Sequence, residues 1–221
     1  MRVLVQYAKQ DRMRYASHRD FARVFERALR RAEVPMAYSS GFTPHPRISY
    51  INPTFTGAES VAEYLVLALS SVVEPDDVRQ RLSSAMPQGF PILDVRPVPK
   101  TPTFTSSLWE VQGTVPCLTL SAGEQLTTML SSPLEVVRET KNGPRRFDVR
   151  PALESLTLTE EGALRMVIRH TEPLIRPDDV LAALRSLHPQ LGPTDLIIRL
   201  AQTDDGDKGD VELVTRDAGD I

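Results

Sequence analysis

The sequence predicts an α+β fold built from two ferredoxin-like (βαββαβ) domains in tandem, each with an antiparallel sheet. The first observation is a repeated helix: residues 74–87 (EPDDVRQRLSSAMP) and 176–189 (RPDDVLAALRSLHP) share seven identities at one constant offset. Each copy has strand-like runs before and after it, which favours internal duplication. The second observation is the order of elements in the first half, which is that of a split βαβ unit.

The first half can be assigned element by element. RVLVQYA at 2–8 is a strand, and Ser17 with Asp20 three residues later forms a capping box at the start of a helix. Apolar residues then recur at helical spacing, so one face of this helix is expected in the core: Phe21, Val24, Phe25, Ala28, Leu29 and Ala32. The remaining strands are expected at 47–53, 62–70 and 92–98, with the first PDDV helix before the last of them.

The second half can be read in the same order. We expect a strand at 107–115, a weak helix at 122–132, strands or a hairpin around the turn KNGP, a strand at 164–171, the second PDDV helix and a strand at 196–202. The join is VPKTPTFTSS, which contains two prolines. The predicted domains are therefore residues 1–99 and 107–202. Residues 203–221 are predicted to be a disordered acidic tail, since 201–221 holds seven Asp/Glu against two Lys/Arg.

The composition is that of a soluble globular protein, with 41% hydrophobic and 25% charged residues among 221. No apolar run approaches the ~18 residues of a membrane span. The single cysteine, Cys117, excludes an internal disulfide and the usual cysteine sets for zinc or iron–sulfur clusters. We expect a cytoplasmic protein without membrane contact. Walker, GxGxxG, HExxH and GxSxG motifs are absent, so no cofactor and no metal are predicted.

Positive charge is concentrated at the start of the chain. Residues 1–50 hold ten Lys/Arg against four Asp/Glu, although the net charge of the chain is −3. Four arginines share one face of the first helix: Arg23, Arg27, Arg30 and Arg31. Arginine favours bidentate contacts with phosphate, so this face is a candidate surface for an anionic partner. The alternative is a solvated helix face without a ligand.

The loop YSSGFTPHPRISY follows this helix. Pro44 and Pro46 flank His45 and restrict its backbone, so its ring is presented with little entropy left to lose. With Phe42 and Arg47, this loop is predicted to bind phosphate and stack a base. The alternative is a structural loop whose histidine caps a backbone group.

A second basic patch lies in RETKNGPRRFDVRP of the second half. Its candidate nucleic-acid contacts are Lys141, Arg145, Arg146 and Arg150. The alternative is a hairpin with a charged tip. With a basic surface on each domain, a path for a nucleic-acid strand between the two is expected.

Two motifs in the first half resemble a known family. The motifs are Ser17-His18 with Asp20, and Gly41-Phe42 followed by Pro44-His45-Pro46-Arg47; the run ERALRRA and the later Asp148-Val149-Arg150-Pro151 agree with them. This pattern resembles bacterial radical-SAM-associated domains of unknown function, which occur alone or fused behind a radical SAM enzyme. The resemblance implies association with a radical SAM enzyme and no established activity.

The leading hypothesis is an RNA-binding accessory protein, without catalysis of its own, that presents RNA to a partner enzyme. One alternative is a metal-independent endoribonuclease in which His18 and His45 act as general acid and base. Another is a protein–protein adaptor whose basic helix docks an acidic partner. The sequence leaves the RNA and the oligomeric state open.

Overall fold

The N-terminal half of the chain consists of four strands, two α-helices and one 3₁₀ turn. The computed structural model describes residues 1–113, 133–140, 143–187 and 191–204. The elements of this half follow the predicted order, with bounds that differ by a few residues. They are β1 (Arg2–Lys9), η1 (Asp11–Tyr15), α1 (His18–Arg31), β2 (Ile48–Ile51), β3 (Glu59–Ala68), α2 (Pro75–Ala85) and β4 (Ile92–Pro97).

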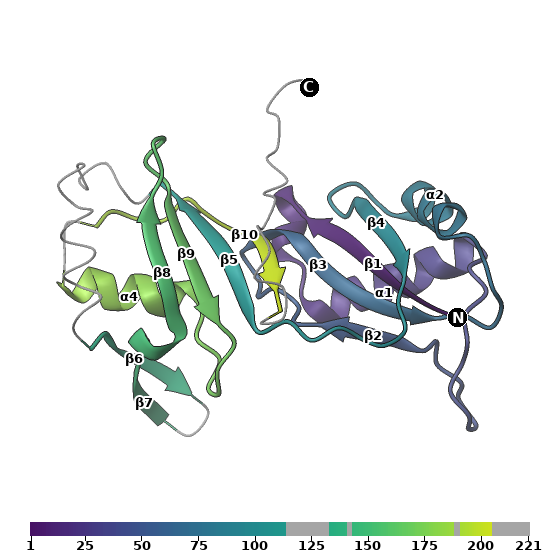
Figure 1. Ribbon diagram of the computed structural model, residues 1–221, viewed down its shortest axis with the longest axis horizontal. Helices are drawn as coiled ribbons and strands as arrows, with labels where there is room; N and C mark the ends of the chain where they lie inside the picture. The colour runs from purple at the N-terminus through teal and green to yellow at the C-terminus, as the bar shows by residue number, and fades with distance from the viewer. Residues whose placement is uncertain (114–132, 141–142, 188–190, 205–221) are drawn as a thin grey trace.

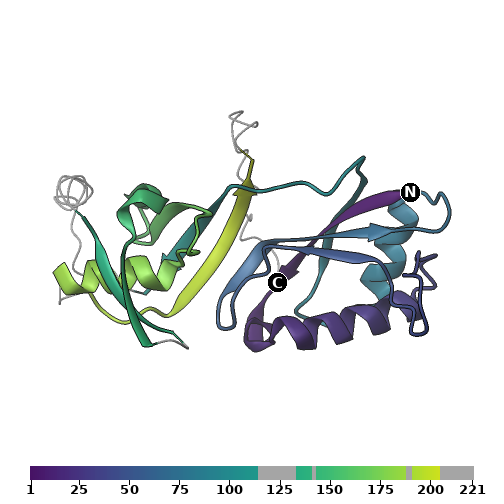
Figure 2. The same cartoon turned by 90° about the horizontal axis from the view of Figure 1, so that it is seen from below.

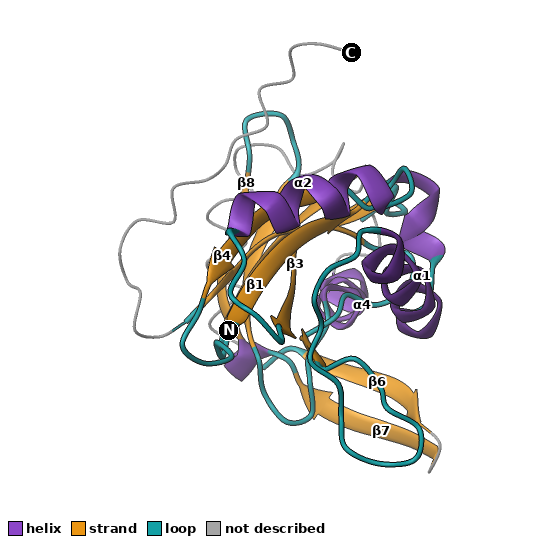
Figure 3. Ribbon diagram, turned by 90° about the vertical axis from the view of Figure 1, so that its right-hand side faces the viewer, coloured by secondary structure: helices purple, strands orange, loops and turns teal. Residues whose placement is uncertain are grey.

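The C-terminal half adds six strands and one described α-helix. They are β5 (Ser106–Gln112), β6 (Glu135–Thr140), β7 (Gly143–Asp148), the 3₁₀ turn η2 (Arg150–Ala152), β8 (Leu153–Leu158), β9 (Leu164–Arg169), α4 (Pro177–Leu187) and β10 (Leu196–Thr203). β6 and β7 form a separate hairpin that projects from the main sheet (Figure 3). Cys117, the helix expected at 122–132 and the tail from 205 onward lie outside the described residues.

Helix α1 begins where the capping box predicts. Ser17 is the N-cap, and its Oγ accepts a hydrogen bond from the backbone N–H of Asp20 at 3.2 Å. The Ser17 hydroxyl also donates to the Asp20 carboxylate at 2.6 Å. Phe21, Phe25 and Leu29 are buried, as the helical spacing predicts. The Phe21 ring stacks on Phe25 with centroids 5.6 Å apart, so the apolar face of α1 is anchored at its first two turns.

One mostly antiparallel sheet runs through both halves, which makes the fold α+β. Its strand order is β4-β1-β3-β10-β5-β9-β8, with β2 paired on β3 beside this path. The two halves lie side by side and meet where β3 and β10 pair in parallel, through Glu59 with Ile198 and Ser60 with Arg199 (Figures 1 and 2). Two separate sheets were expected, and the continuous sheet is a finding of the structure.

Each half has its own apolar core. In the N-terminal core, Val78 and Leu82 of α2 are buried; in the C-terminal core, Val180 and Leu184 of α4 hold the corresponding positions. Both PDDV helices therefore bury the first two residues of the apolar stripe that helical spacing predicts. The third residue is partly buried at the C-terminal end of α2 (Met86) and 50% exposed in α4 (Leu187). Among the described residues, no helix is long and apolar enough to cross a membrane.

A buried ion pair holds the junction of the two halves. Glu63 on β3 and Arg199 on β10 pair directly and are 2% and 3% exposed. Arg199 also donates to the backbone carbonyl of Asn52 at 2.7 Å and to Ser60 Oγ at 3.3 Å. The backbone N–H of Thr54 donates to the Glu63 carboxylate at 3.2 Å. Every charge in this network is thus paired and hydrogen-bonded, as burial requires.

The ion pair also sets the protonation of the junction. Burial by itself would raise the pKa of the Glu63 carboxyl. The Arg199 guanidinium and the hydrogen bonds from Thr54 and Ser60 outweigh burial, so the pKa of Glu63 lies below its ordinary value. Glu63 therefore stays ionised at neutral pH.

Candidate functional site

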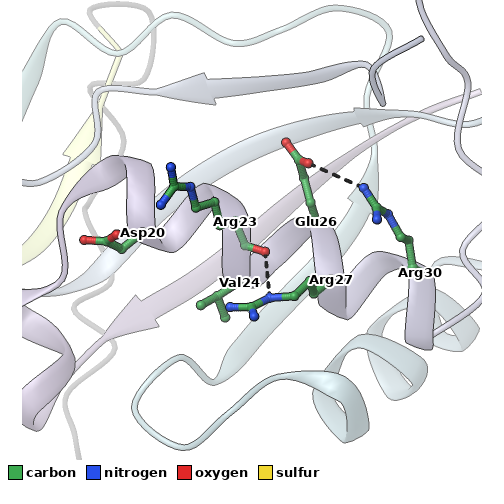
Figure 4. Close-up of a pocket in the computed structure, with 6 residues that line it drawn as sticks. All are labelled: Asp20, Arg23, Val24, Glu26, Arg27 and Arg30. Atoms are coloured by element: carbon green, nitrogen blue, oxygen red, sulfur yellow. Dashed lines mark hydrogen bonds and ion pairs between the residues drawn. The ribbon is translucent and has the colours of Figure 1, made fainter. Parts of the chain in front are cut away.

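The exposed face of α1 carries a row of arginines. Figure 4 shows Arg23, Arg27 and Arg30 around a shallow groove of about 490 Å³ on this helix. The Arg27 Nε donates to the Arg23 carbonyl at 3.3 Å, and Arg30 lies 4.0 Å from Glu26. The Arg23 side chain makes no hydrogen bond or ion pair with any described residue. This surface can therefore accept an anion without breaking a strong internal contact.

The fourth predicted arginine of the helix points elsewhere. Arg31 donates from Nη2 to the carbonyl of Ala85, at the end of α2. Arg31 therefore joins α1 to α2 although it is also exposed, and the arginines that line the groove are Arg23, Arg27 and Arg30. We call these three residues the arginine row.

The loop between α1 and β2 extends beyond the end of the sheet (Figure 1). Its Phe42 is fully exposed, and Gly41 has a φ of 138°, a backbone conformation that favours glycine. The backbone N–H of His45 donates to Ser39 Oγ at 3.0 Å, while the His45 and Arg47 side chains are exposed without a described partner. The loop thus presents the Phe42 ring, the His45 imidazole and the Arg47 guanidinium to solvent.

The second basic patch is largely engaged within the protein. Arg146 pairs with Glu135 at 3.0 Å, and Arg150 donates to the carbonyl of Leu153 at 2.8 Å. Arg145 of β7 is exposed opposite Arg138 of β6, and Lys141 lies outside the described residues. This patch therefore offers fewer available cations than the arginine row.

A pocket of about 640 Å³ lies between the two halves. The first half lines it with His18 and residues 52–56, and the second half with residues of β5, β9, β10 and the start of α4. His18, the first residue of α1, therefore connects the arginine row with the pocket. His45 does not line this pocket, so the structure does not bring the two predicted histidines together there.

Aromatic side chains form one wall of the pocket. The rings of Phe55 and Trp109 lie 5.8 Å apart between centroids, tilted by 30°. The buried Arg199 guanidinium covers the Trp109 ring at 5.5 Å, and Arg176 lies 5.9 Å from the centre of Phe55. Such an arrangement suits a planar ligand, since both cations and other rings pack on aromatic faces.

His170 is the second histidine of the pocket. Its Nδ1 lies 2.8 Å from the carbonyl oxygen of Phe104, which can only accept, so Nδ1 carries the proton. Its Nε2 then accepts from the Ser107 hydroxyl at 2.6 Å. Burial lowers the pKa of His170 and Arg199 lowers it further, while the Phe104 carbonyl acts in the opposite sense. The net result is an imidazole that is neutral at pH 7.

Two further charges border the pocket at the start of α4. The Arg176 side chain makes no hydrogen bond or salt bridge with any described residue, and the same is true of the Asp178 carboxylate. Burial and the neighbouring Asp179 raise the pKa of Asp178, while the charges of Arg176 and Arg185 act in the opposite sense. Both groups are therefore available to a ligand.

The described residues contain no cluster of three or more His, Cys, Asp or Glu side chains that could hold a metal ion. The site residues that sequence reasoning missed are those of the pocket, chiefly Phe55, Trp109, His170 and Arg176. One signal could have pointed to their surroundings: Glu63 and Arg199 interrupt otherwise apolar strands, which indicates a buried polar contact.

Comparisons with known proteins identify an uncharacterised family. A solved structure described as an unknown protein from Galdieria sulphuraria is 16% identical, with 86% of this chain and 92% of that one covered and a TM-score of 0.25. A structure described as a RAMP protein binding different RNA substrates is 11% identical, with coverages of 76% and 87% and a TM-score of 0.24. No curated protein matches. The family described as "Uncharacterized protein conserved in bacteria (DUF2344)" matches residues 2–177, and the chain belongs to this family.

Proposed function

We propose that this protein binds RNA and presents it to a partner enzyme. The observation that carries the proposal is the arginine row, whose guanidinium groups are exposed and have at most weak partners. Arginine forks match phosphate oxygens in geometry. The exposed loop contains Phe42, His45 and Arg47. It follows the C-terminal end of α1 and adds the aromatic ring of Phe42 and the positive charge of Arg47.

The bound RNA strand is expected to run along α1. His18 to Arg30 spans twelve residues, or about 18 Å along a helix. Phosphates would contact Arg23, Arg27 and Arg30 in turn, and an unstacked base would lie on Phe42. Arg145 of β7 is a secondary contact, since Arg146 and Arg150 are already engaged.

The test is the salt dependence of binding to a fluorescent single-stranded RNA. Affinity should fall linearly with salt on a double-logarithmic plot, with a slope of about −0.7 for each neutralised phosphate. Arg23→Gln and Arg27→Gln should each make the slope shallower by about 0.7, uniformly across sequences. Fluorescence anisotropy at four or more salt concentrations measures both quantities.

Arg81→Gln is the matched control, because Arg81 is an exposed arginine of the neighbouring helix α2. Its slope should equal that of the wild type. Binding that is undetectable, or that does not depend on salt, would contradict the proposal. If Arg81→Gln and Arg23→Gln lowered RNA affinity equally, the net charge of the protein, and not the arginine row, would govern binding.

The partner enzyme is proposed to be a radical SAM enzyme. Support comes from the resemblance of the SHRD and GFTPHPR segments to domains found beside such enzymes. The rival is an adaptor in which the arginine row docks an acidic protein surface. Co-purification that persists after nuclease treatment would favour the adaptor.

RNA cleavage is a second candidate function, favoured by two histidines on one pocket. His18 and His170 both line it, and the neutral His170 can accept a proton at Nε2 if the Ser107 hydroxyl turns away. If this protein cleaves labelled RNA in the presence of chelator, His18→Ala should abolish cleavage. His45→Ala should leave it unchanged, because His45 lies in the exposed loop. Uncut RNA would exclude this candidate.

Tandem ferredoxin-like domains over residues 1–99 and 107–202 remain our proposal for the architecture. Two strand orders support it: β4-β1-β3-β2 in the first half and β10-β5-β9-β8 in the second. In each, the last strand lies beside the first and the third beside the second. The helix that would complete the second copy falls outside the described residues.

A further inference from the structure

We infer that the pocket between the two halves binds one unstacked nucleotide, with its base against Phe55 and Trp109 and its phosphate at Arg176. The inference rests on the proposed function in one respect, because the nucleotide is taken from a strand bound along α1. The nucleotide site itself is argued from the pocket alone.

Size and shape favour a ligand of this kind. The volume of about 640 Å³ falls within the range of small-molecule sites, which is roughly 300–1,000 Å³. The aromatic lining consists of Phe55, which is half-buried, and Trp109, which is 7% exposed. Ile168, Leu174 and Ile175 add apolar walls. A nucleobase is planar with two π-faces, and proteins that bind single strands place bases on such rings.

The polar groups of the pocket fall into two sets. Arg199, Ser107 and His170 are satisfied by contacts within the protein. Arg176, Asp178 and His18 are not, as each side chain lacks a hydrogen-bond or salt-bridge partner among the described residues. A ligand that enters can therefore pair with the second set without disrupting the first.

The unpaired groups match the parts of a nucleotide. Arg176 is a cation beside the Phe55 ring, so it can hold a phosphate while the base packs on the aromatic wall. Asp178 accepts hydrogen bonds, as base N–H and amino groups require. His18 lines the pocket and stands edge-on to the Tyr50 ring, with centroids 4.7 Å apart, a contact that orients its imidazole.

The position of the pocket suits a strand better than a free metabolite. His18 is both the first residue of α1 and part of the pocket lining, and Asp20 and Arg23 of the α1 groove follow within the next two turns. A strand on the arginine row would therefore reach the pocket without crossing another element. An RNA base that enters the pocket would no longer stack on the neighbouring bases of its strand.

Trp109 makes the test direct, because it is the only tryptophan of the chain. The full-length protein is titrated with AMP, GMP, CMP and UMP, and Trp109 fluorescence is excited at about 295 nm, where nucleotides absorb little. We expect saturable quenching. Arg176→Gln should weaken the apparent Kd about tenfold or more, the size expected for a lost hydrogen bond to a charged group. Arg81→Gln, an exposed arginine away from the pocket, should leave the Kd unchanged.

A second measurement uses a strand. A single-stranded RNA with one 5-iodouridine is cross-linked by ultraviolet light, and the attached residues are mapped by mass spectrometry. Attachment at Phe55 or Trp109 is expected. His18→Gln should reduce it, and circular dichroism checks that both variants remain folded.

The outcomes separate the two proposals. Quenching by mononucleotides without strand binding supports the pocket and contradicts the RNA-binding function. Salt-dependent strand binding, with neither quenching nor attachment at the pocket, overturns the inference and leaves the function standing. Loss of both signals overturns both proposals. Quenching by an acidic peptide but by no nucleotide would assign the pocket to a protein partner and overturn the inference.

Discussion

Arg199→Met should lower the free energy of unfolding by about 3–5 kcal/mol, the cost of leaving a buried partner charge uncompensated. Glu63 would remain between β3 and β10 at 2% exposure without its counter-ion. The hydrogen bonds to the Asn52 carbonyl and Ser60 Oγ would be lost as well. Urea unfolding followed by circular dichroism measures the change.

Two controls isolate the buried charge. Arg165→Met removes an arginine that pairs with Glu110 at 2.9 Å in the same sheet, but Arg165 is 35% exposed. Its cost should be about 1 kcal/mol or less. The double variant Glu63→Gln/Arg199→Met should recover part of the loss, since no unpaired charge remains. Equal costs for Arg199→Met and Arg165→Met would contradict this account of the junction.

The Glu63–Arg199 ion pair also predicts that the contribution of Glu63 to stability depends on pH in opposite directions in the wild type and in Arg199→Met. In the wild type the folded pKa of Glu63 is lowered, so its contribution is present above the unfolded pKa and is lost as pH falls through the folded value. In Arg199→Met, burial would raise the folded pKa above the unfolded one. Stability of that variant relative to the wild type should therefore improve as the solution is acidified.

Phe25→Ala should also cost about 3–5 kcal/mol, through lost burial and the cavity that remains. Phe25 is a fully buried residue of α1, and it stacks on Phe21 with ring centroids 5.6 Å apart. The cavity would lie on the side of α1 opposite the arginine row. Urea unfolding measures this change, and a loss below about 1 kcal/mol would mean that the core closes around the gap.

Phe42→Ala is the matched control for this substitution. Phe42 is fully exposed, so stability should change by no more than about 0.5 kcal/mol. If Phe42 stacks a base as proposed, RNA affinity should instead fall by about 1–3 kcal/mol. The two phenylalanines should thus separate folding from binding, and a stable Phe42→Ala protein with unchanged RNA affinity would remove Phe42 from the interface.

Local patterns predicted most of the fold. The capping residues at Ser17 and Asp20 and the apolar spacing of Phe21, Phe25 and Leu29 define α1, and the structure confirms both. The same spacing placed Arg23, Arg27 and Arg30 on the opposite face. These features were predictable because each depends on residues within one or two turns of the same helix.

The candidate site was predicted only in part. The arginine row and the exposure of Arg31 follow from helical periodicity, whereas the hydrogen bond from Arg31 to the Ala85 carbonyl of α2 does not. Periodicity gives the direction of a side chain around its own helix, but it does not give the neighbouring element. Trp109 and His170 were missed because neither belongs to a local motif.

The sequence by itself determined the α+β class, the order of strands and helices in the first half and the arginine face of α1, because periodicity and capping act over a few residues. The tertiary structure alone decided that β3 and β10 pair, which brings Ser60 and Arg199 into hydrogen-bond contact across 139 positions of the chain. That pairing places the first residues of α1 and of α4 around one pocket. The physical reason is that a strand pattern shows which face is buried but not which strand lies beside it.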